Sequence, residues 1–417
     1  TIGDNSVALV AQSLGGGGGS ISVNLTDASS PISLLTLGSA DTDSTNSGLL
    51  EVVNQSNLQT AGVGSPSLLL QSIGGGGGAV QTLSDSSATN IQFGVDAVLI
   101  NSKSLASSGA INFTSNSNSL ISTAGDFSAA AIIQSIGGGG GWALTNSQAA
   151  TALGAGVLND AHNSLDAIVF NEAFYGVAKG GPVTADVSGT IQTTGSTSPG
   201  FVVQSIGGGG GYAGNSDGFA QLGGYYRDST IGISGSSNAL MPIACQFGSC
   251  PEGTVEQAVL VDIDGRLLTT GSTSPVMLVQ AVGGGGGRLG TIGGNATLGI
   301  KSGTGLMQAA GGSIRVVSNA GASLSSIGND SAALVVQSIG GGGGTVNSIG
   351  GNATLGANST GNLSAGAITL NGPFTAQTKG ANSPGVVLQS IGGGGGLAAD
   401  VDGDQIDFGT LGTANTS

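Results

Sequence analysis

Short apolar segments separated by polar turn residues dominate this chain. The segments are rich in Val, Ile, Leu and Ala, and they are bounded by Gly, Asn, Ser and Asp. This alternation is typical of β-strands joined by tight turns. It predicts strands over the segments 191–194, 201–206, 314–318, 334–339, 367–370 and 386–391. Helical periodicity is confined to 165–177, so we predict an all-β fold.

One apolar segment is copied seven times, each time directly before a run of five glycines. The runs occupy 15–19, 74–78, 137–141, 207–211, 283–287, 340–344 and 392–396. A Gln lies three positions before every run: Gln12, Gln71, Gln134, Gln204, Gln280, Gln337 and Gln389. A Ser lies nine positions before every run, and a Gly lies twelve before it. Because repetition in register indicates a repeat architecture, we interpret 1–417 as one continuous array of seven cassettes.

The constant position of the Gln in all seven cassettes suggests a structural role. In the fourth cassette, strand alternation places Gln204 on the same face as Val202 and Ile206. A Gln buried between apolar neighbours costs free energy unless its amide is hydrogen-bonded. Stacked copies would satisfy it through an amide ladder. A Gln that faces solvent is the alternative, and the sequence leaves both arrangements open.

The pentaglycine run has three interpretations. A flexible hinge is the ordinary role of polyglycine, but seven runs of one length in fixed register with an apolar strand argue against it. A phosphate-binding loop requires a Lys followed by Ser or Thr directly after the glycines, and none of the seven runs is followed by that pair. We favour the third interpretation, in which backbone without side chains lets a second backbone layer approach closely.

The spacing of the cassettes predicts a parallel β-solenoid, or β-helix, with loop excursions. Successive runs begin 59, 63, 70, 76, 57 and 52 residues apart, so loops of different length leave a common frame. The longest intervals place excursions within 142–183 and 212–260. We expect two or three coils of ~20–25 residues in each interval, a right-handed winding and an elongated shape of ~80–100 Å.

Composition excludes several classes of function. Only 7% of the residues are charged, the net charge is −15, and the eight basic residues are spread singly, so no nucleic-acid-binding surface is expected. No apolar run is long enough for a transmembrane segment or a signal peptide. The first cassette is already under way at Gly3, so we expect this chain to be a fragment of a longer protein.

Few residues suggest metal or redox chemistry. Cys245 and Cys250 are too few, with His162 remote, to form a four-ligand zinc site, so a local disulfide is favoured over free thiols. One carboxylate cluster resembles a calcium loop, although it departs from the EF-hand pattern; a solvated acidic turn is the alternative. Its residues are Asp400, Asp402, Asp404 and Asp407. No catalytic constellation can be assembled, and no other cofactor is expected.

The cassette G-S-T-S-P-G-F-V-V-Q-S-I-G-G-G-G-G at 195–211 resembles Gly-rich segments repeated in large autotransporter-type surface proteins of Gram-negative bacteria. The resemblance implies an exported passenger region with a β-helical fold and closely spaced Cys pairs. It leads us to expect a non-catalytic structural or adhesive fibre at the bacterial cell surface. Self-association is the expected interaction, with surfaces or glycans as further partners. The alternative is a β-helical polysaccharide-degrading enzyme or a carbohydrate-binding passenger, but the dispersed cations and the few aromatic residues make an enzyme less favourable.

Overall fold

The computed structural model describes the chain in fifteen stretches. They are residues 1–23, 34–38, 46–82, 90–93, 107–145, 151–153, 176–216, 220–222, 225–226, 232–236, 257–299, 301–302, 307–356, 362–403 and 405–408. The described part is all-β, with no helix, and every pairing between its strands is parallel. The predicted parallel β-solenoid is therefore confirmed, while its handedness stays a prediction.

Two sheets of seven strands each are built from the cassettes and the glycine runs. The first sheet contains β1 (Leu9–Leu14), β6 (Leu68–Ile73), β11 (Ala131–Ile136), β17 (Phe201–Ile206), β24 (Met277–Val282), β31 (Leu334–Ile339) and β37 (Val386–Ile391). The second sheet contains β2 (Gly18–Val23), β7 (Gly77–Thr82), β12 (Gly140–Thr145), β18 (Gly210–Ser216), β25 (Gly286–Ile292), β32 (Gly343–Ile349) and β38 (Gly395–Val401).

The chain between the second sheet and the next cassette supplies four more long sheets. The third contains β3 (Leu34–Leu37), β8 (Asn90–Phe93), β13 (Thr151–Leu153), β19 (Ala220–Leu222), β26 (Ala296–Leu298), β33 (Ala353–Leu355) and β39 (Ile406–Phe408). The fourth contains β14 (Gly176–Gly180), β21 (Gly232–Ser236), β28 (Met307–Ala310) and β34 (Asn362–Ser364).

The fifth sheet contains β4 (Leu50–Asn54), β9 (Ile111–Ser115), β15 (Val183–Val187), β22 (Val259–Ile263), β29 (Ile314–Ser318) and β35 (Ile368–Asn371). The sixth contains β5 (Leu58–Thr60), β10 (Leu120–Thr123), β16 (Thr190–Thr193), β23 (Arg266–Thr269), β30 (Ser323–Ser326) and β36 (Thr375–Thr378). β20 (Tyr225–Tyr226) and β27 (Lys301–Ser302) form a small separate pair.

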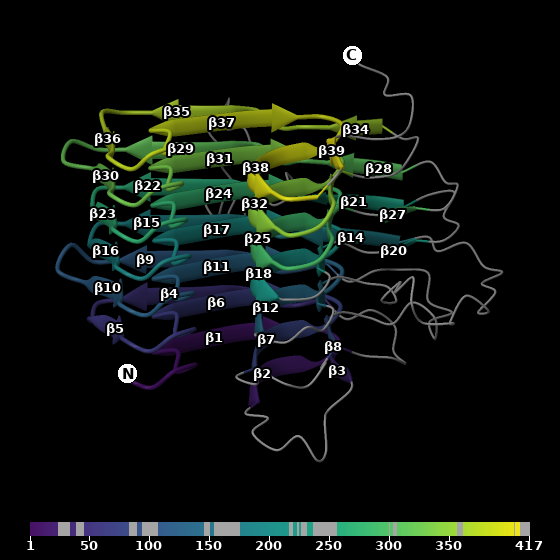
Figure 1. Cartoon of the computed structure of the whole chain (residues 1–417), viewed down its shortest axis with the longest axis horizontal. Coiled ribbons are helices and arrows are strands. Elements are labelled where there is room, and N and C mark those ends of the chain that lie inside the picture. The colour runs from purple at the N-terminus through teal and green to yellow at the C-terminus, as the bar shows by residue number, and fades with distance from the viewer. Residues whose placement is uncertain are drawn as a thin grey trace, which may run out of the picture.

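Each interval between cassettes forms one wide coil, so the expectation of two or three short coils was wrong. Gln204 of β17 pairs with Gln134 of β11 on one side and with Gln280 of β24 on the other, one full interval away in each direction. Figure 1 shows the resulting layers stacked in chain order from the N-terminal to the C-terminal rung. At about 4.8 Å per layer, seven rungs rise by roughly 30 Å, far less than the length expected for short coils.

The coil is wide because it folds back on itself around the first sheet. One face of that sheet, with Phe201 and Val203, packs against the fifth and sixth sheets in the largest apolar cluster. The opposite face, with Val202, packs against Trp142 and Tyr212 of the second sheet. A third cluster lies between the second and third sheets. Short coils of 20–25 residues could not bury the cassette strand on both faces, which explains why the whole interval is needed.

Several of the predicted elements can be compared directly with the structure. The strands predicted at 201–206, 314–318, 334–339 and 386–391 are observed with those bounds, and those at 191–194 and 367–370 are shifted by one residue. The helix expected at 165–177 falls mostly outside the described residues, and its last two residues belong to β14. The described parts of 142–183 and 212–260 lie mainly in the common sheets, and the rest of those excursions lies outside the described residues. Among the residues that the structure describes, no helix could cross a membrane.

Candidate functional site

The seven cassette glutamines form a continuous ladder of side-chain amides through the centre of the stack. The Nε2 of Gln134 donates to the Oε1 of Gln204 at 2.7 Å, and the Nε2 of Gln204 donates to the Oε1 of Gln280 at 2.7 Å. The same bond joins every consecutive pair of rungs, at 2.6–2.9 Å. Gln204 is 0% exposed. The structure therefore shows the buried ladder, not the solvent-facing alternative.

A second bond from each Gln connects the ladder to the glycine run. The Nε2 of Gln71 donates to the carbonyl oxygen of Gly78 at 3.0 Å, and the equivalent bond occurs in all seven rungs. Each amide nitrogen thus has two acceptors, one in its own coil and one in the next, except at the last rung. Since buried polar networks are favourable only when satisfied, this double bonding explains how a Gln is accommodated between apolar layers.

In the inner rungs, the glycine runs combine a bend with two strand residues at which a side chain would overlap the neighbouring rung. In the fourth run, Gly208 and Gly209 have φ of 77° and 88°, and Gly210 and Gly211 have φ of 137° and 136°. A Cβ on Gly210 would overlap the carbonyl oxygen of Gly286 in the next rung. The distance between these two atoms would be well below 3.0 Å, the shortest contact that Cβ atoms make in real structures. Left-handed backbone and overlap both require glycine here.

The first glycine of a run meets a different backbone layer. A Cβ on Gly137 would overlap the backbone of Lys179 in the fourth sheet, and one on Gly283 would overlap Ala310. The backbone of the fourth sheet therefore packs directly against the start of the run. This contact is the close approach of a second backbone layer that we favoured as the role of the glycine run.

The Gly and Ser that precede the cassette strand form a hydrogen-bonded corner between rungs. The hydroxyl of Ser198 accepts from the backbone N–H of Ser128 at 2.9 Å and donates to the carbonyl of Gly125 at 3.0 Å. The next rung repeats both bonds through Ser274. A Cβ on Gly195 would overlap the carbonyl of Gly125. The cassette positions twelve and nine before the run are thus fixed by contact between corners.

The Ser directly after the Gln forms a second series of hydrogen bonds, which connects the first sheet to the residues that precede the strands of the fifth sheet. The Oγ of Ser205 donates to the carbonyl oxygen of Gly181 at 2.9 Å, and Ser338 makes the same bond to Gly312 at 2.9 Å. The fifth cassette lacks this Ser and has Ala281 instead. The position equivalent to Gly181 is there Gln257, two residues before β22. Donor and close-packed glycine are therefore lost together in that rung.

Arg288 is a buried cation at the position directly after the fifth glycine run. It is 1% exposed, and its Nη2 donates to the carbonyl of Thr273 at 3.2 Å. Its Cζ lies 5.4 Å from the ring centroid of Tyr212 on the preceding rung. Its Nε has no hydrogen-bond partner in the described part of the chain. The aromatic face offsets part of the cost of burying this charge.

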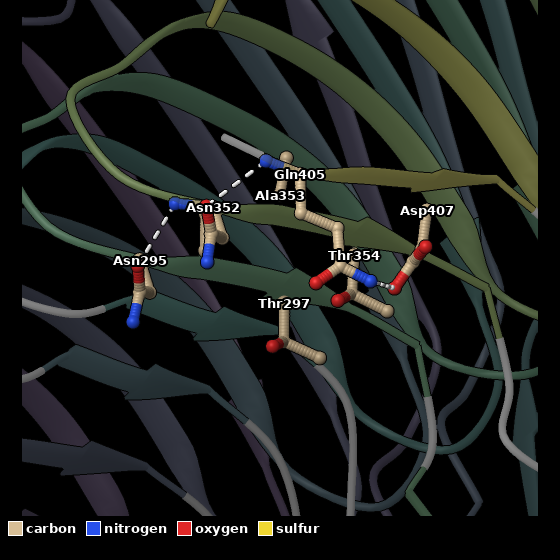
Figure 2. A pocket seen from close by; sticks show the side chains of 8 residues that line it. Asn295, Thr297, Asn352, Ala353, Thr354, Gln405 and Asp407 are labelled. Atoms are coloured by element: carbon tan, nitrogen blue, oxygen red, sulfur yellow. Dashed lines mark hydrogen bonds between the residues drawn. The ribbon is translucent and has the colours of Figure 1, made fainter. Parts of the chain in front are cut away.

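The solvent-facing side of the third sheet carries a shallow polar hollow of about 240 Å³. Two rows of side chains line it, and each row contains one residue from each of three consecutive coils. The first row is Asn295, Asn352 and Gln405, and the second is Thr297, Thr354 and Asp407. Figure 2 shows both rows above the backbone of β26, β33 and β39. The hollow presents amide and hydroxyl groups and one carboxylate.

Hydrogen bonds order the first row from rung to rung. The backbone N–H of Asn352 donates to Oδ1 of Asn295 at 2.8 Å, and that of Gln405 donates to Oδ1 of Asn352 at 3.1 Å. The Nε2 of Gln405 also donates to Oδ2 of Asp407 at 2.9 Å. The sequence interpretation missed this hollow. An exact repeat, I-G-G-N-A-T-L-G at 292–299 and again at 349–356, was the available signal.

The residues predicted to bind calcium are only partly described. Asp400 and Asp402 are exposed near the end of β38, Asp407 lies half-buried in the hollow, and Asp404 lies outside the described residues. No group of three or more carboxylate, His or Cys side chains with metal-binding geometry occurs among the described residues. Cys245 and Cys250 lie outside the described residues, so the disulfide stays a prediction.

One carboxylate on the fifth sheet, that of Asp262, has a raised pKa. Asp262 pairs in register with Asp186. Burial raises the pKa of Asp262 above its ordinary value of 3.8, and the charges of Asp186 and Asp264 raise it further, while Arg315 opposes them. Asn319 donates to Oδ1 of Asp262 at 3.1 Å. Because the folded state disfavours the ionised carboxyl, this group lowers the free energy of unfolding as the pH rises from 3.8 through the folded-state pKa.

We expect Asp262→Asn to stabilise the protein at neutral pH by about 0.5 kcal/mol, because it removes repulsion between carboxylates on neighbouring strands while retaining an acceptor for Asn319. The gain should vanish below the pH at which Asp262 is protonated in both states. Urea unfolding at pH 3 and pH 7 measures it, with the exposed Asp402→Asn as the control. A gain of equal size at both pH values would contradict the electrostatic explanation.

No protein-family profile, curated protein or solved structure matches this chain.

Proposed function

We propose that this chain is a non-catalytic structural or adhesive fibre segment at the surface of a bacterial cell. The observation that carries the proposal is that the repeated cassette positions make contacts between rungs. The Gln forms the amide ladder, the Ser and Gly form the corner, and the glycine run permits close stacking. A motif with this role specifies extension of a stack, which is what a fibre requires.

The charge and site chemistry support the same proposal. With 7% charged residues, neighbouring surfaces carry few groups that repel one another, so association with other copies is part of the proposal. The hollow on the third sheet has one carboxylate, Asp407, whereas glycoside hydrolysis uses a pair. Nothing in the hollow therefore favours the enzyme over the fibre, although its amides and hydroxyls suit contact with a hydrated surface.

Calcium binding between β38 and β39 is a subsidiary proposal. Asp400, Asp402, Asp404 and Asp407 supply oxygen ligands close together in sequence, with Gly403 in the turn. Titration of calcium into chelator-treated protein, compared with Asp402→Asn, tests it. A melting temperature that is unchanged by calcium would remove the ion from the proposal.

The test of the fibre proposal is the location and form of the native protein. Antibody labelling of intact cells that produce it, viewed by electron microscopy, should decorate thin extensions from the cell surface. Protease treatment of the same intact cells should remove both the label and the extensions. Label found only after cells are opened, or label without any extended structure, would contradict the proposal.

A further inference from the structure

The two matched rungs of the polar hollow each contain an Asn-x-Thr tripeptide. Asn295, Ala296 and Thr297 form the first, and Asn352, Ala353 and Thr354 form the second. This tripeptide is the acceptor sequence for transfer of a sugar to an asparagine amide. We propose that Asn295 and Asn352 are glycosyl acceptor sites, each carrying a sugar on Nδ2.

The repetition of the outward-facing residues is not explained by the core. Ala296 and Leu298 point inward and belong to the cluster between the second and third sheets, so packing accounts for their repetition in the next rung. Asn295 is exposed and Thr297 is half-buried on the opposite face of the strand. Packing in the core places no such demand on these two positions, although both recur unchanged in the next rung.

The geometry of the two Asn side chains presents the atom that would be modified. The Oδ1 of Asn295 is held by the backbone N–H of Asn352, and the Oδ1 of Asn352 is held by the backbone N–H of Gln405. Neither Nδ2 has a hydrogen-bond partner among the residues that the structure describes. Figure 2 shows both nitrogens pointing away from these bonds. The amide is therefore fixed by its oxygen while its nitrogen stays free at the surface.

The Thr two residues later lies beside its Asn. Alternation along the strand puts Thr297 on the same face as Asn295, and Thr354 on the same face as Asn352. All four side chains line the hollow. Within the described stretches, neither Thr hydroxyl has a hydrogen-bond partner, so both remain available to an enzyme that recognises the tripeptide.

The tripeptides that begin at Asn54, Asn329 and Asn112, also within the described part, each differ from the pair in the hollow. Asn54 is 7% exposed, and its Nδ2 donates to the carbonyl of Ser56 at 3.0 Å. Asn329 is followed by Ser331, which is fully buried and donates to Gly271 at 3.1 Å. Asn112 lies second in the five-residue strand β9 and is paired on both sides, whereas Asn295 and Asn352 directly precede their strands.

The modification requires an activated sugar and a separate transferase. The co-reactant is a glycosyl diphosphate. The Nδ2 of Asn295 or Asn352 forms a bond to the anomeric carbon as the bond from that carbon to the diphosphate oxygen breaks. The diphosphate leaves with the electron pair, and one proton of Nδ2 passes to a base of the transferase. No oxidant or reductant takes part.

Peptide mass spectrometry of protein purified from the cells that produce it tests the proposal. Fragmentation that preserves the glycosidic bond should place a sugar on Asn295 and on Asn352, while the peptide containing Asn54 serves as an unmodified internal control. Asn295→Asp should abolish the first modification but retain an oxygen for Asn352, as Asp126 does for the N–H of Ser196 at 2.7 Å. Thr297→Val should also abolish it, and Thr297→Ser should restore it.

Three results would overturn the proposal. They are unmodified Asn295 and Asn352 in native protein, a sugar found on Thr297 or Thr354 instead, and modification that persists in Thr297→Val. Thermal melting of each variant, expected to match that of the parent without sugar, shows that any loss of modification does not come from misfolding.

Discussion

Gly210→Ala is expected to be among the most destabilising single substitutions in this protein, costing about 4 kcal/mol or more. The added methyl group would overlap the carbonyl oxygen of Gly286, which belongs to the backbone of the neighbouring rung and cannot move without opening the sheet. The φ of Gly210, 137°, is also a conformation that an L-residue rarely adopts. Urea unfolding measures the effect, and failure to obtain folded protein is the extreme form of the same result.

Two further glycines separate the causes of this effect. Gly19 has φ of 151° but nothing within 4 Å of its Cβ position, so Gly19→Ala tests backbone conformation alone and should cost about 1 kcal/mol. Gly385 has neither an unusual φ nor a neighbour, so Gly385→Ala should change the stability by less than about 0.5 kcal/mol. If all three substitutions were tolerated equally, the glycine runs would be linkers and not packing elements.

Gln204→Leu should cost about 2–4 kcal/mol, because it interrupts the amide ladder at a fully buried rung. The Oε1 of Gln280 loses its donor, and the Nε2 of Gln134 loses the better of its two acceptors. The new side chain is apolar and of similar size, so a change in buried volume does not explain the loss. Equilibrium unfolding in urea measures it.

Position along the ladder and exposure provide the controls for this prediction. Gln389→Leu at the last rung breaks one link between side chains instead of two, so its cost should be smaller. Gln192 lies on the half-exposed face of β16. Gln192→Leu should therefore change the free energy of unfolding by less than about 0.5 kcal/mol. Equal effects at Gln192 and Gln204 would show that the buried ladder contributes nothing specific.

The fold class could be predicted from the sequence because the cassette encodes local features. The short apolar segment from Phe201 to Ile206 predicts a strand, and its repetition in register predicts parallel stacking. The role of glycine as a point of close approach followed from its register with that strand. These features depend on residues that are near each other in the chain or are repeated along it.

The number of coils could not be predicted, because it depends on contacts between segments that are far apart within one interval. Nothing near Val202 shows that its face will be covered by Trp142 and Tyr212 from the second sheet. Without that covering layer, a strand with one buried face suggests a narrow coil. The polar hollow was missed for a similar reason, since Asn295 and Thr297 become neighbours of Asn352 and Thr354 only when the rungs stack.

Removal of one interval shows whether each cassette interval forms one coil. Deleting 283–339 joins Val282 to Gly340, so β37 would take the place of β31 above β24 with every ladder in register. We expect a folded six-rung protein with the β-type circular dichroism of the parent and cooperative unfolding. Deleting only 312–339 removes about half of a coil and should prevent folding. If the half-coil deletion folded as well as the full one, the solenoid would consist of shorter coils, and one interval would not be one coil.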